Sequence, residues 1–164
     1  MIKHFRELGI FSLFLALFLL AGCATKRYEP PTAALIVFKT PTLRYADQGF
    51  VYRAKEGVKV QVYASGKPVF ELEAGKRVCV DGRCMDEERF YKEFMGTEYP
   101  RGTLSAIFSR RPVFGGKNLE CEGGRCLQRI RAPGRYDIIY AFDSRSAKFK
   151  DRLNRIYIKM TETP

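Results

Sequence analysis

The sequence predicts a mainly β domain of the β-rich α+β type, built as an antiparallel sandwich or a partly open barrel with a short insertion of one or two helices. Three observations support this fold class. Apolar and polar residues alternate in several short segments, which is the period of a half-buried strand. Two-residue turn signals, Asp81-Gly82 and Gly123-Gly124, interrupt those segments. Only the central region 86–108 changes to helical spacing.

The first half of the domain is expected to contain five strands. In the third of them, Val58, Val60 and Val62 alternate with more polar residues. A turn at 64–67 would join this strand to a fourth that has one solvated face. The five segments are 35–38, 50–53, 58–63, 70–74 and 77–80.

Helical spacing predicts the insertion, which is followed by further strands. In the expected helix 86–96, Glu87 and Glu88 lie in the first turn, where they complement the helix dipole, and Gly96 would end the helix. Segment 103–108 predicts a second helix. The apolar stripe of the first helix is assigned to the core and consists of Phe90, Tyr91, Phe94 and Met95. Strands are expected to return at 127–131, 136–142 and 155–160.

The N-terminus carries an export signal. Residues 1–6 are basic, and the apolar run 10–21 is too short for a membrane span, which needs roughly 20 residues, but fits a secretory signal. The run ends in LAGC, with the cysteine at Cys23, and this ending resembles the lipobox of bacterial lipoprotein precursors. In that family the cysteine thiol receives a diacylglyceryl group, the chain is cut just before it, and the new amino group is usually acylated. The resemblance implies that Cys23 is the lipidated first residue of the mature protein.

This resemblance also implies how the chain is divided. We expect a signal peptide at 1–22, a lipidated cysteine and extended tether at 23–32, and a single β-rich domain at 33–164. Ala24 follows the cysteine, where many lipoproteins retained in the inner membrane of Gram-negative bacteria have aspartate. The resemblance therefore implies an outer-membrane anchor with the domain in the periplasm, or exposed on the surface. Ordinary secretion with Cys23 as an unmodified thiol is the alternative.

The chain is strongly basic, with a formal net charge of +11, and residues 1–22 contribute only +1 of it. An exported protein does not meet nucleic acid as a normal partner. The expected partners are the membrane, through the N-terminal lipid, and an envelope protein or an anionic envelope component, such as phospholipid head groups, lipopolysaccharide phosphates or acidic glycans. A solvated surface that only keeps the domain soluble is the alternative.

Four cysteines form two similar motifs, CVDGRC and CEGGRC. The C-x4-C spacing lacks the tight knuckle of a zinc site and the C-x-x-C pattern of a redox pair. Export favours disulfides. The two-residue turns would place Cys79 opposite Cys84 and Cys121 opposite Cys126, at non-hydrogen-bonded positions about 4.5 Å apart. We therefore expect two local disulfides and no metal site, with bridges between the two motifs as the alternative.

Several arginines form a candidate anion-binding site. Arg125, Arg129 and Arg131 fall on one side of an expected strand, and they would bind phosphate or carboxylate if further arginines converged on them. The further candidates are Arg135, Arg110 and Arg111. A solvent-facing side of the strand without a dedicated ligand is the alternative, and it is the one that we favour.

The composition argues against catalysis. His4 is the only histidine and belongs to the signal peptide, so the mature chain has no Ser-His or Cys-His nucleophile and no histidine-ligated zinc. Glu87, Glu88 and Glu93 are weak candidates for glycosidase acids. We therefore predict no catalytic residues and no cofactor, and a membrane-anchored envelope lipoprotein that acts as a binding, assembly or structural module. A small envelope enzyme or accessory factor acting on peptidoglycan or lipid is the alternative.

Overall fold

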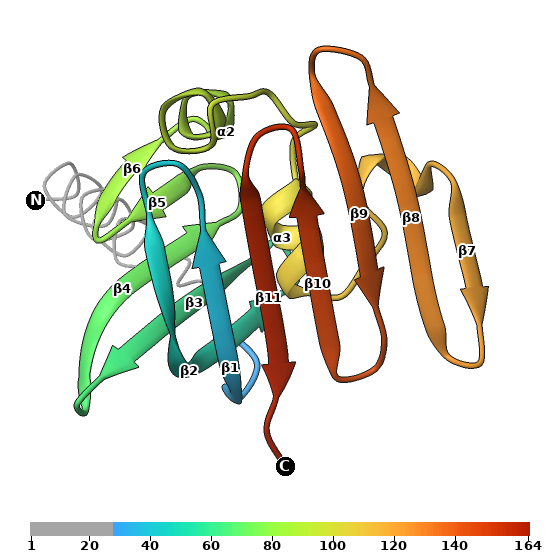
Figure 1. Ribbon diagram of the computed structural model, residues 1–164. Coiled ribbons are helices and arrows are strands. Elements are labelled where there is room, and N and C mark those ends of the chain that lie inside the picture. Colours follow the sequence, from blue (N-terminus) through green and yellow to red (C-terminus); the bar gives the residue numbers. More distant parts are fainter. Residues whose placement is uncertain (1–27) are drawn as a thin grey trace, which may run out of the picture.

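The computed structural model describes residues 28–164, in which eleven strands form one antiparallel sheet (Figure 1). The order across the sheet is β6-β5-β4-β3-β2-β1-β11-β10-β9-β8-β7, so β6 and β7 are free edges and the sheet is not closed. The strands are β1 (Thr32–Lys39), β2 (Arg44–Ala54), β3 (Gly57–Ala64), β4 (Lys67–Ala74), β5 (Val78–Val80), β6 (Arg83–Met85), β7 (Leu119–Glu122), β8 (Arg125–Ala132), β9 (Tyr136–Phe142), β10 (Ser146–Asp151) and β11 (Ile156–Glu162). The predicted β-rich fold with a small helical insertion is confirmed.

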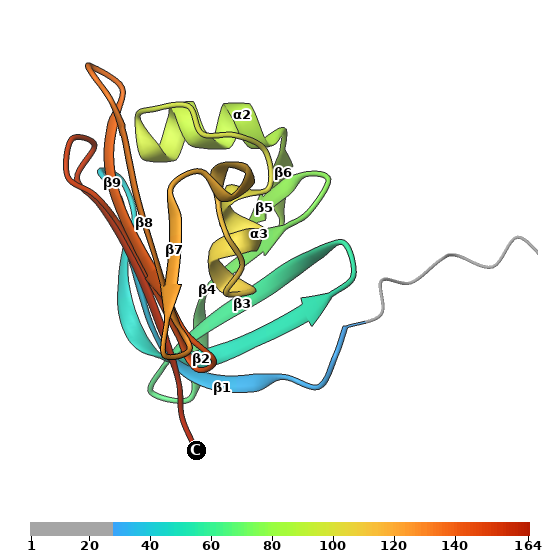
Figure 2. The same ribbon diagram turned by 90° about the vertical axis from the view of Figure 1, so that its right-hand side faces the viewer.

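The sheet folds back over its own concave side. Strands β8 to β11 form one wall, and β3 and β4 cross behind that wall, with the helix α3 (Thr103–Phe108) between the two layers (Figure 2). The short helix α2 (Glu87–Phe90) continues as the π-helix η1 (Tyr91–Met95), and together they cover one open end. A 3-10 turn, η2 (Phe114–Gly116), leads from α3 towards β7. The molecule therefore has a filled inner side and an outer sheet surface that faces solvent in several directions.

The core is built around α3. All six of its residues are buried, and Phe108 stacks on Phe38 of β1 with ring centroids 6.4 Å apart. Phe90, Tyr91 and Met95 are also buried, so this part of the predicted apolar stripe belongs to the core. A helix of six residues is unstable by itself in water. Packing between the two layers of the sheet therefore holds α3 in place.

Glu87 lies in the first turn of α2 as expected, but its side chain is buried and contacts the start of α3. One carboxylate oxygen accepts a hydrogen bond from the Gly102 backbone N–H at 2.8 Å, and the other accepts one from the Tyr91 hydroxyl. That hydroxyl in turn accepts a hydrogen bond from the Leu104 N–H. Burial, together with the charge of Glu87, raises the pKa of Tyr91 well above its ordinary value. The side chains of Glu87 and Tyr91 thus accept hydrogen bonds from backbone N–H groups that would otherwise have no partner at the start of α3.

Strand β10 is absent from the sequence-based prediction. In it Ala147, Phe149 and Asp151 face the core, and Lys148 and Lys150 face solvent. The buried Asp151 carboxylate accepts hydrogen bonds from the Tyr99 hydroxyl at 2.6 Å and from the backbone N–H groups of Asp137 in β9 and Leu153 in the turn after β10. An acidic residue can therefore occupy a core position here, because neighbouring segments supply its donors.

Part of the expected tether lies against the domain. The Glu29 backbone N–H donates a hydrogen bond to the Arg53 carbonyl at 2.7 Å, and the Tyr28 hydroxyl donates one to Glu73 in β4 at 3.2 Å. Strand β1 begins at Thr32. The signal peptide, the lipobox and Cys23 lie outside the described residues, so their assignment stays a prediction.

Both predicted disulfides are present. Cys79 pairs with Cys84 and Cys121 pairs with Cys126, each directly opposite in its hairpin, with Cα atoms 3.9 Å and 4.1 Å apart. The four turn residues all have positive φ angles, as a type I′ turn requires. These angles are 46° at Asp81, 81° at Gly82, 55° at Gly123 and 78° at Gly124. With their thiols paired, these cysteines do not form a zinc site.

Candidate functional site

The register of the sheet gathers cations on the outer surface of one wall. Arg129 of β8 lies opposite Ile139 of β9, Ile139 opposite Lys150 of β10, and Lys150 opposite Tyr157 of β11. The same row continues through Lys39 of β1 to Arg44 of β2. In the next row on one side, Lys148 lies opposite Lys159. In the next row on the other side, Arg131 of β8 lies opposite Asp137 of β9. We call this surface the basic face, and its exposed cations are Lys39, Arg44, Arg129, Arg131, Lys148, Lys150 and Lys159.

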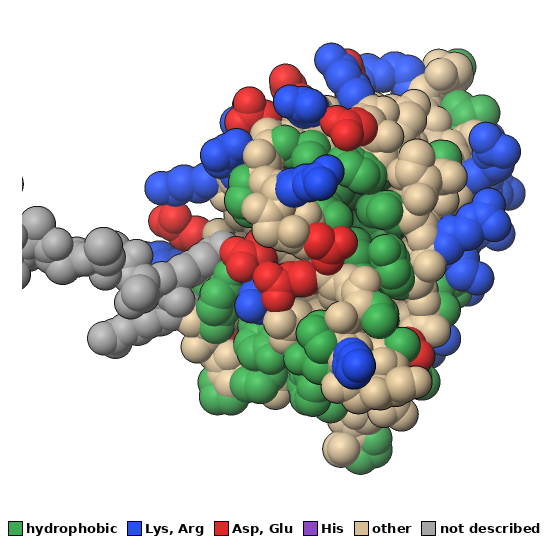
Figure 3. Space-filling model, turned by 90° about the vertical axis from the view of Figure 1, so that its left-hand side faces the viewer, with side chains coloured by type: hydrophobic (Ala, Val, Ile, Leu, Met, Phe, Trp, Pro, Cys, Tyr) green, Lys and Arg blue, Asp and Glu red, His purple; other side chains and the backbone are tan. Residues whose placement is uncertain are grey.

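Most cations of the basic face have no acidic partner. Within residues 28–164 the structure shows an ion pair for Arg131 alone among them, at 3.2 Å from Asp137, which Arg152 also contacts at 2.7 Å. Figure 3 shows Lys and Arg side chains crowded along one edge of the molecule, which is this face seen from the side. An anionic ligand would therefore meet donors that are not already engaged.

Two pairs of like charges stand directly opposite each other on neighbouring strands. Lys148 is paired with Lys159, and Lys39 with Arg44. Directly opposed residues on one face have Cβ atoms about 4.5–5.5 Å apart, and like charges in that position destabilise the sheet. The cations of the basic face are thus not arranged for the stability of the free protein.

The six predicted arginines do not form one cluster. Arg125, Arg129 and Arg131 are all exposed on the outer side of β8, as the alternation predicted. Arg135 lies in the turn after β8, with its guanidinium 5.6 Å from the centre of the Tyr136 ring. Arg125 and Arg135 therefore mark opposite ends of β8, and the strand between them separates them by roughly 25 Å.

Arg110 and Arg111 lie after α3, on the inner side of the sheet. Arg110 forms an ion pair with Glu162, which also binds Arg53 at 2.8 Å, and Arg111 donates a hydrogen bond to Ser105 at 3.3 Å. Arg53 also donates to the Phe108 carbonyl at 3.1 Å, so it helps to cap the C-terminal end of α3. Burial lowers the pKa of Arg53 and of Arg110, and the charge of Arg53 lowers that of Arg110 further. These arginines stabilise the contact between the C-terminal end of α3 and β11, and they do not join the basic face.

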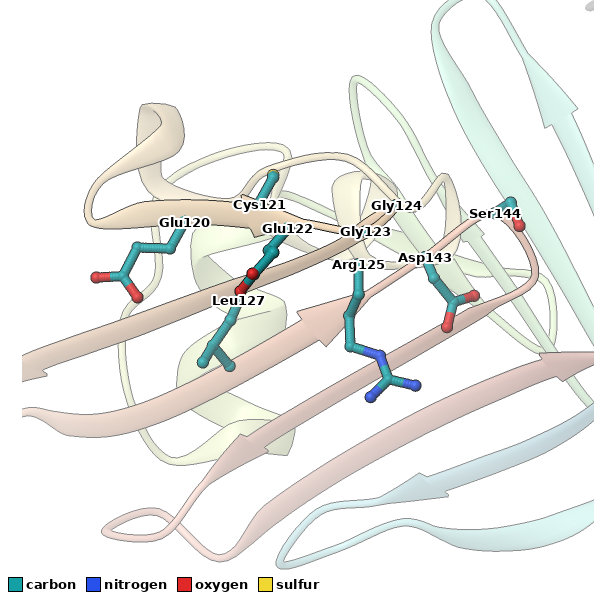
Figure 4. A pocket seen from close by; sticks show the side chains of 9 residues that line it. All are labelled: Glu120, Cys121, Glu122, Gly123, Gly124, Arg125, Leu127, Asp143 and Ser144. Carbon is teal, nitrogen blue, oxygen red and sulfur yellow. The ribbon is translucent and has the colours of Figure 1, made fainter.

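A shallow hollow borders the basic face at the tip of the β7–β8 hairpin (Figure 4). Its volume is about 900 Å³, and Glu120, Glu122, Arg125 and Asp143 supply its charged groups. Hydrogen bonds from the backbone N–H of Arg145 and from Ser146 hold the pKa of the Asp143 carboxyl below its ordinary value. Because acidic groups outnumber basic ones here, the hollow forms an acidic margin of the basic face.

No catalytic constellation emerges from the described residues. Among residues 28–164, no group of His, Cys, Asp or Glu side chains is placed to hold a metal ion. Of the three candidate acids, Glu87 is buried against α3, Glu93 is exposed and bonded to Arg89 at 3.3 Å, and Glu88 is exposed on α2. The acids therefore do not face one another across a common cleft.

The outer surface of β2, β3 and β4 has a different character. Phe50 of β2 packs edge-on against Tyr63 of β3 with ring centroids 5.7 Å apart, and Tyr28 packs in the same manner against Tyr52 at 6.2 Å. We call this surface, with Tyr28, Phe50, Tyr52 and Tyr63, the aromatic face. Lys59 forms an ion pair with Glu71 at 3.2 Å on this face, and Glu73 accepts a hydrogen bond from the Tyr28 hydroxyl.

Comparison with known proteins gives no family for this chain. The sequence matches no protein-family model and none of the curated proteins compared with it. Among the described residues, no helix is long and apolar enough to cross a membrane.

Proposed function

We propose that this chain is a lipid-anchored protein of the bacterial cell envelope, acylated at Cys23, whose β domain binds an anionic envelope component or an acidic region of an envelope protein through the basic face. The observation that carries the proposal is the set of unpaired cations on β1, β2, β8, β10 and β11, with two like-charge pairs directly opposed. Such an arrangement lowers the stability of the free protein, and a bound polyanion would relieve that cost.

The shape of the basic face also supports this function. It is a continuous sheet surface in which Ile139 and Tyr157 stand between the cations of one row. Cations interleaved with apolar and aromatic side chains can contact an extended polymer along several strands at once. Ala24 favours the outer membrane as the site of the anchor, by the resemblance to lipoproteins that are sorted there.

The proposal is tested with two double variants of equal net charge. Arg129→Glu with Lys150→Glu reverses two cations in one row of the basic face, whereas Lys55→Glu with Lys67→Glu reverses two exposed lysines elsewhere, one in a turn and one at the start of β4. The full chain in detergent is titrated against immobilised polyphosphate and, in parallel, polyglutamate. We expect the first variant to bind on the order of tenfold more weakly, which corresponds to about 1.4 kcal/mol, and the second to bind nearly as the parent does.

The two probes separate phosphate from carboxylate recognition. Equal losses in both variants would show that binding follows net charge alone, and would refute a dedicated face. Chemical crosslinking in cells, followed by partner identification for the parent and for the Arg129→Glu, Lys150→Glu variant, then identifies the natural ligand. A partner recovered equally with both chains would likewise contradict the proposal.

A further inference from the structure

The described N-terminus fixes where an anchor at Cys23 can attach. Tyr28 lies on the aromatic face, because its hydroxyl bonds to Glu73 of β4 and its ring packs on Tyr52 of β2. Only four residues, 24–27, lie between it and Cys23, and the five residue-to-residue steps span at most about 18 Å when fully extended. A domain of this length has a radius of gyration of roughly 14 Å, so it is far wider than the tether is long. The anchor therefore has to lie close to the side of the molecule that carries Tyr28.

The basic face points in another direction. In Figure 2 the chain enters β1 on one side of the molecule, and strands β8 to β11 form the wall on the other side. Those strands carry most of the basic face. A tether that starts at Tyr28 is too short to bring the acyl chains around the domain to this wall.

The aromatic face has the chemistry of a surface that rests on lipid. Large apolar side chains stay exposed on or beside it, with exposed fractions of 37% for Phe50, 43% for Val69 and 50% for Leu35. Tyrosine side chains favour the head-group region of a bilayer, because the ring is apolar and the hydroxyl end stays hydrated. A hollow of about 460 Å³ beside Phe50 and Tyr63 adds an uneven apolar surface into which lipid groups can settle. Lys59 pairs with Glu71 here, so this face lacks the excess of cations that marks the basic face.

We infer that the aromatic face is the membrane-docking surface of the protein, and that its occupant is the head-group layer of the bilayer that holds the Cys23 lipid. This inference rests on the lipidation in the proposed function. It places the domain directly on its own membrane and turns the basic face away from that membrane, towards an anionic partner that is not part of it.

The natural absence of tryptophan makes the inference directly measurable. The sequence contains none, so Phe50→Trp and Tyr157→Trp each introduce a single reporter, one on the aromatic face and the matched control on the basic face. The acylated full chain is reconstituted into phosphatidylcholine vesicles whose acyl chains carry bromine near the head groups. We expect the emission of the Phe50→Trp chain to shift to the blue and to lose most of its intensity, and that of the Tyr157→Trp chain to stay unchanged.

Each other outcome contradicts a defined part of the inference. Mass spectrometry of the purified chain first reports whether Cys23 carries acyl groups. Quenching of Tyr157→Trp equal to or above that of Phe50→Trp would overturn the orientation. An acylated chain in which neither reporter is quenched would overturn the docking surface and leave the proposed function intact. A chain without acyl groups would overturn the anchor, and with it both proposals.

Discussion

The basic face and the aromatic face belong to one sheet, yet they treat charge in opposite ways. On β3 and β4, Glu71 accepts a hydrogen bond from Gln61 at 2.6 Å and pairs with Lys59 at 3.2 Å. On β10 and β11, the directly opposed residues Lys148 and Lys159 are both cations. Neighbouring strands on one face stabilise each other, and those on the other repel each other.

The two faces therefore differ in how their charges act on the free protein. On the aromatic face, the pair of Lys59 and Glu71 stabilises neighbouring strands by itself. The unmatched cations of the basic face lower stability, and they are exposed, so packing does not require them. We infer that these cations bind a negatively charged ligand, because such a ligand supplies the counter-charge that the free protein lacks. Three measurements test this contrast, apart from those on binding and docking.

The largest effect is expected from the disulfides, since each half of the sheet ends in one disulfide-bonded hairpin. Replacing both cysteines of a pair by serine removes a small closed loop and should lower the free energy of unfolding by about 2 kcal/mol. Cys121→Ser with Cys126→Ser should also weaken polyphosphate binding, because β8 then loses part of its support from β7. Cys79→Ser with Cys84→Ser, at the other edge, should leave binding unchanged. Urea unfolding and the binding titration measure both quantities, and equal binding losses would contradict the assignment of function to one half.

The next effect concerns the sign of a stability change. Lys148→Glu places a carboxylate opposite Lys159 and should raise the free energy of unfolding by about 0.2–1 kcal/mol, whereas it weakens anion binding. Glu71→Lys makes the reverse change on the aromatic face, removes the partner of Lys59 and Gln61, and should lower stability by a similar amount. Both are measured by urea unfolding at low ionic strength, because salt screens exposed charges.

Opposite signs would sharpen the contrast between the two faces. A loss of stability in Lys148→Glu would show that Lys148 and Lys159 do not repel each other in the free protein. The argument from like-charge pairs to a bound anion would then lose its basis, and the binding titrations alone would have to support the proposed function.

Much of the fold follows from local sequence patterns. The hairpins at 79–84 and 121–126 were predicted with their pairing, because two-residue turns fix the register and the register fixes which cysteines meet. The α3 helix was predicted with the observed bounds. Strand β10 was missed because its inward positions are Ala147, Phe149 and Asp151, of which only Phe149 is a strong strand former. The alternation with Lys148 and Lys150 was the available signal.

The candidate site was predicted only in part. The prediction that Arg125, Arg129 and Arg131 share one exposed side of β8 was correct. The lysines of β1, β10 and β11 lie far from β8 in sequence, and only the order of the strands brings them beside Arg129. Arg110 and Arg111 do not join the basic face, because they lie after α3 on the inner side of the sheet, where Arg110 pairs with Glu162 and Arg111 donates a hydrogen bond to Ser105. This placement depends on tertiary contacts that the sequence alone does not reveal. The role of Glu87 at the start of α3 likewise depends on a contact between separate helices.

The smallest expected effect is a pH-dependent loss of the contact between Tyr28 and Glu73 on the aromatic face. Burial, followed by the charge and hydrogen bond of Glu73, raises the pKa of Tyr28 from 10.0 to about 12. Because the folded-state pKa is the higher one, the contact contributes its full stabilisation below pH 10 and loses it as the pH rises through 12. The difference between the ultraviolet titration curves of the parent and Tyr28→Phe should therefore show a phenol that ionises near pH 12. A difference curve centred near pH 10 would show that Tyr28 is not held against Glu73. The anchor would then reach further than we infer, and the two faces would no longer be forced to point in different directions relative to the membrane.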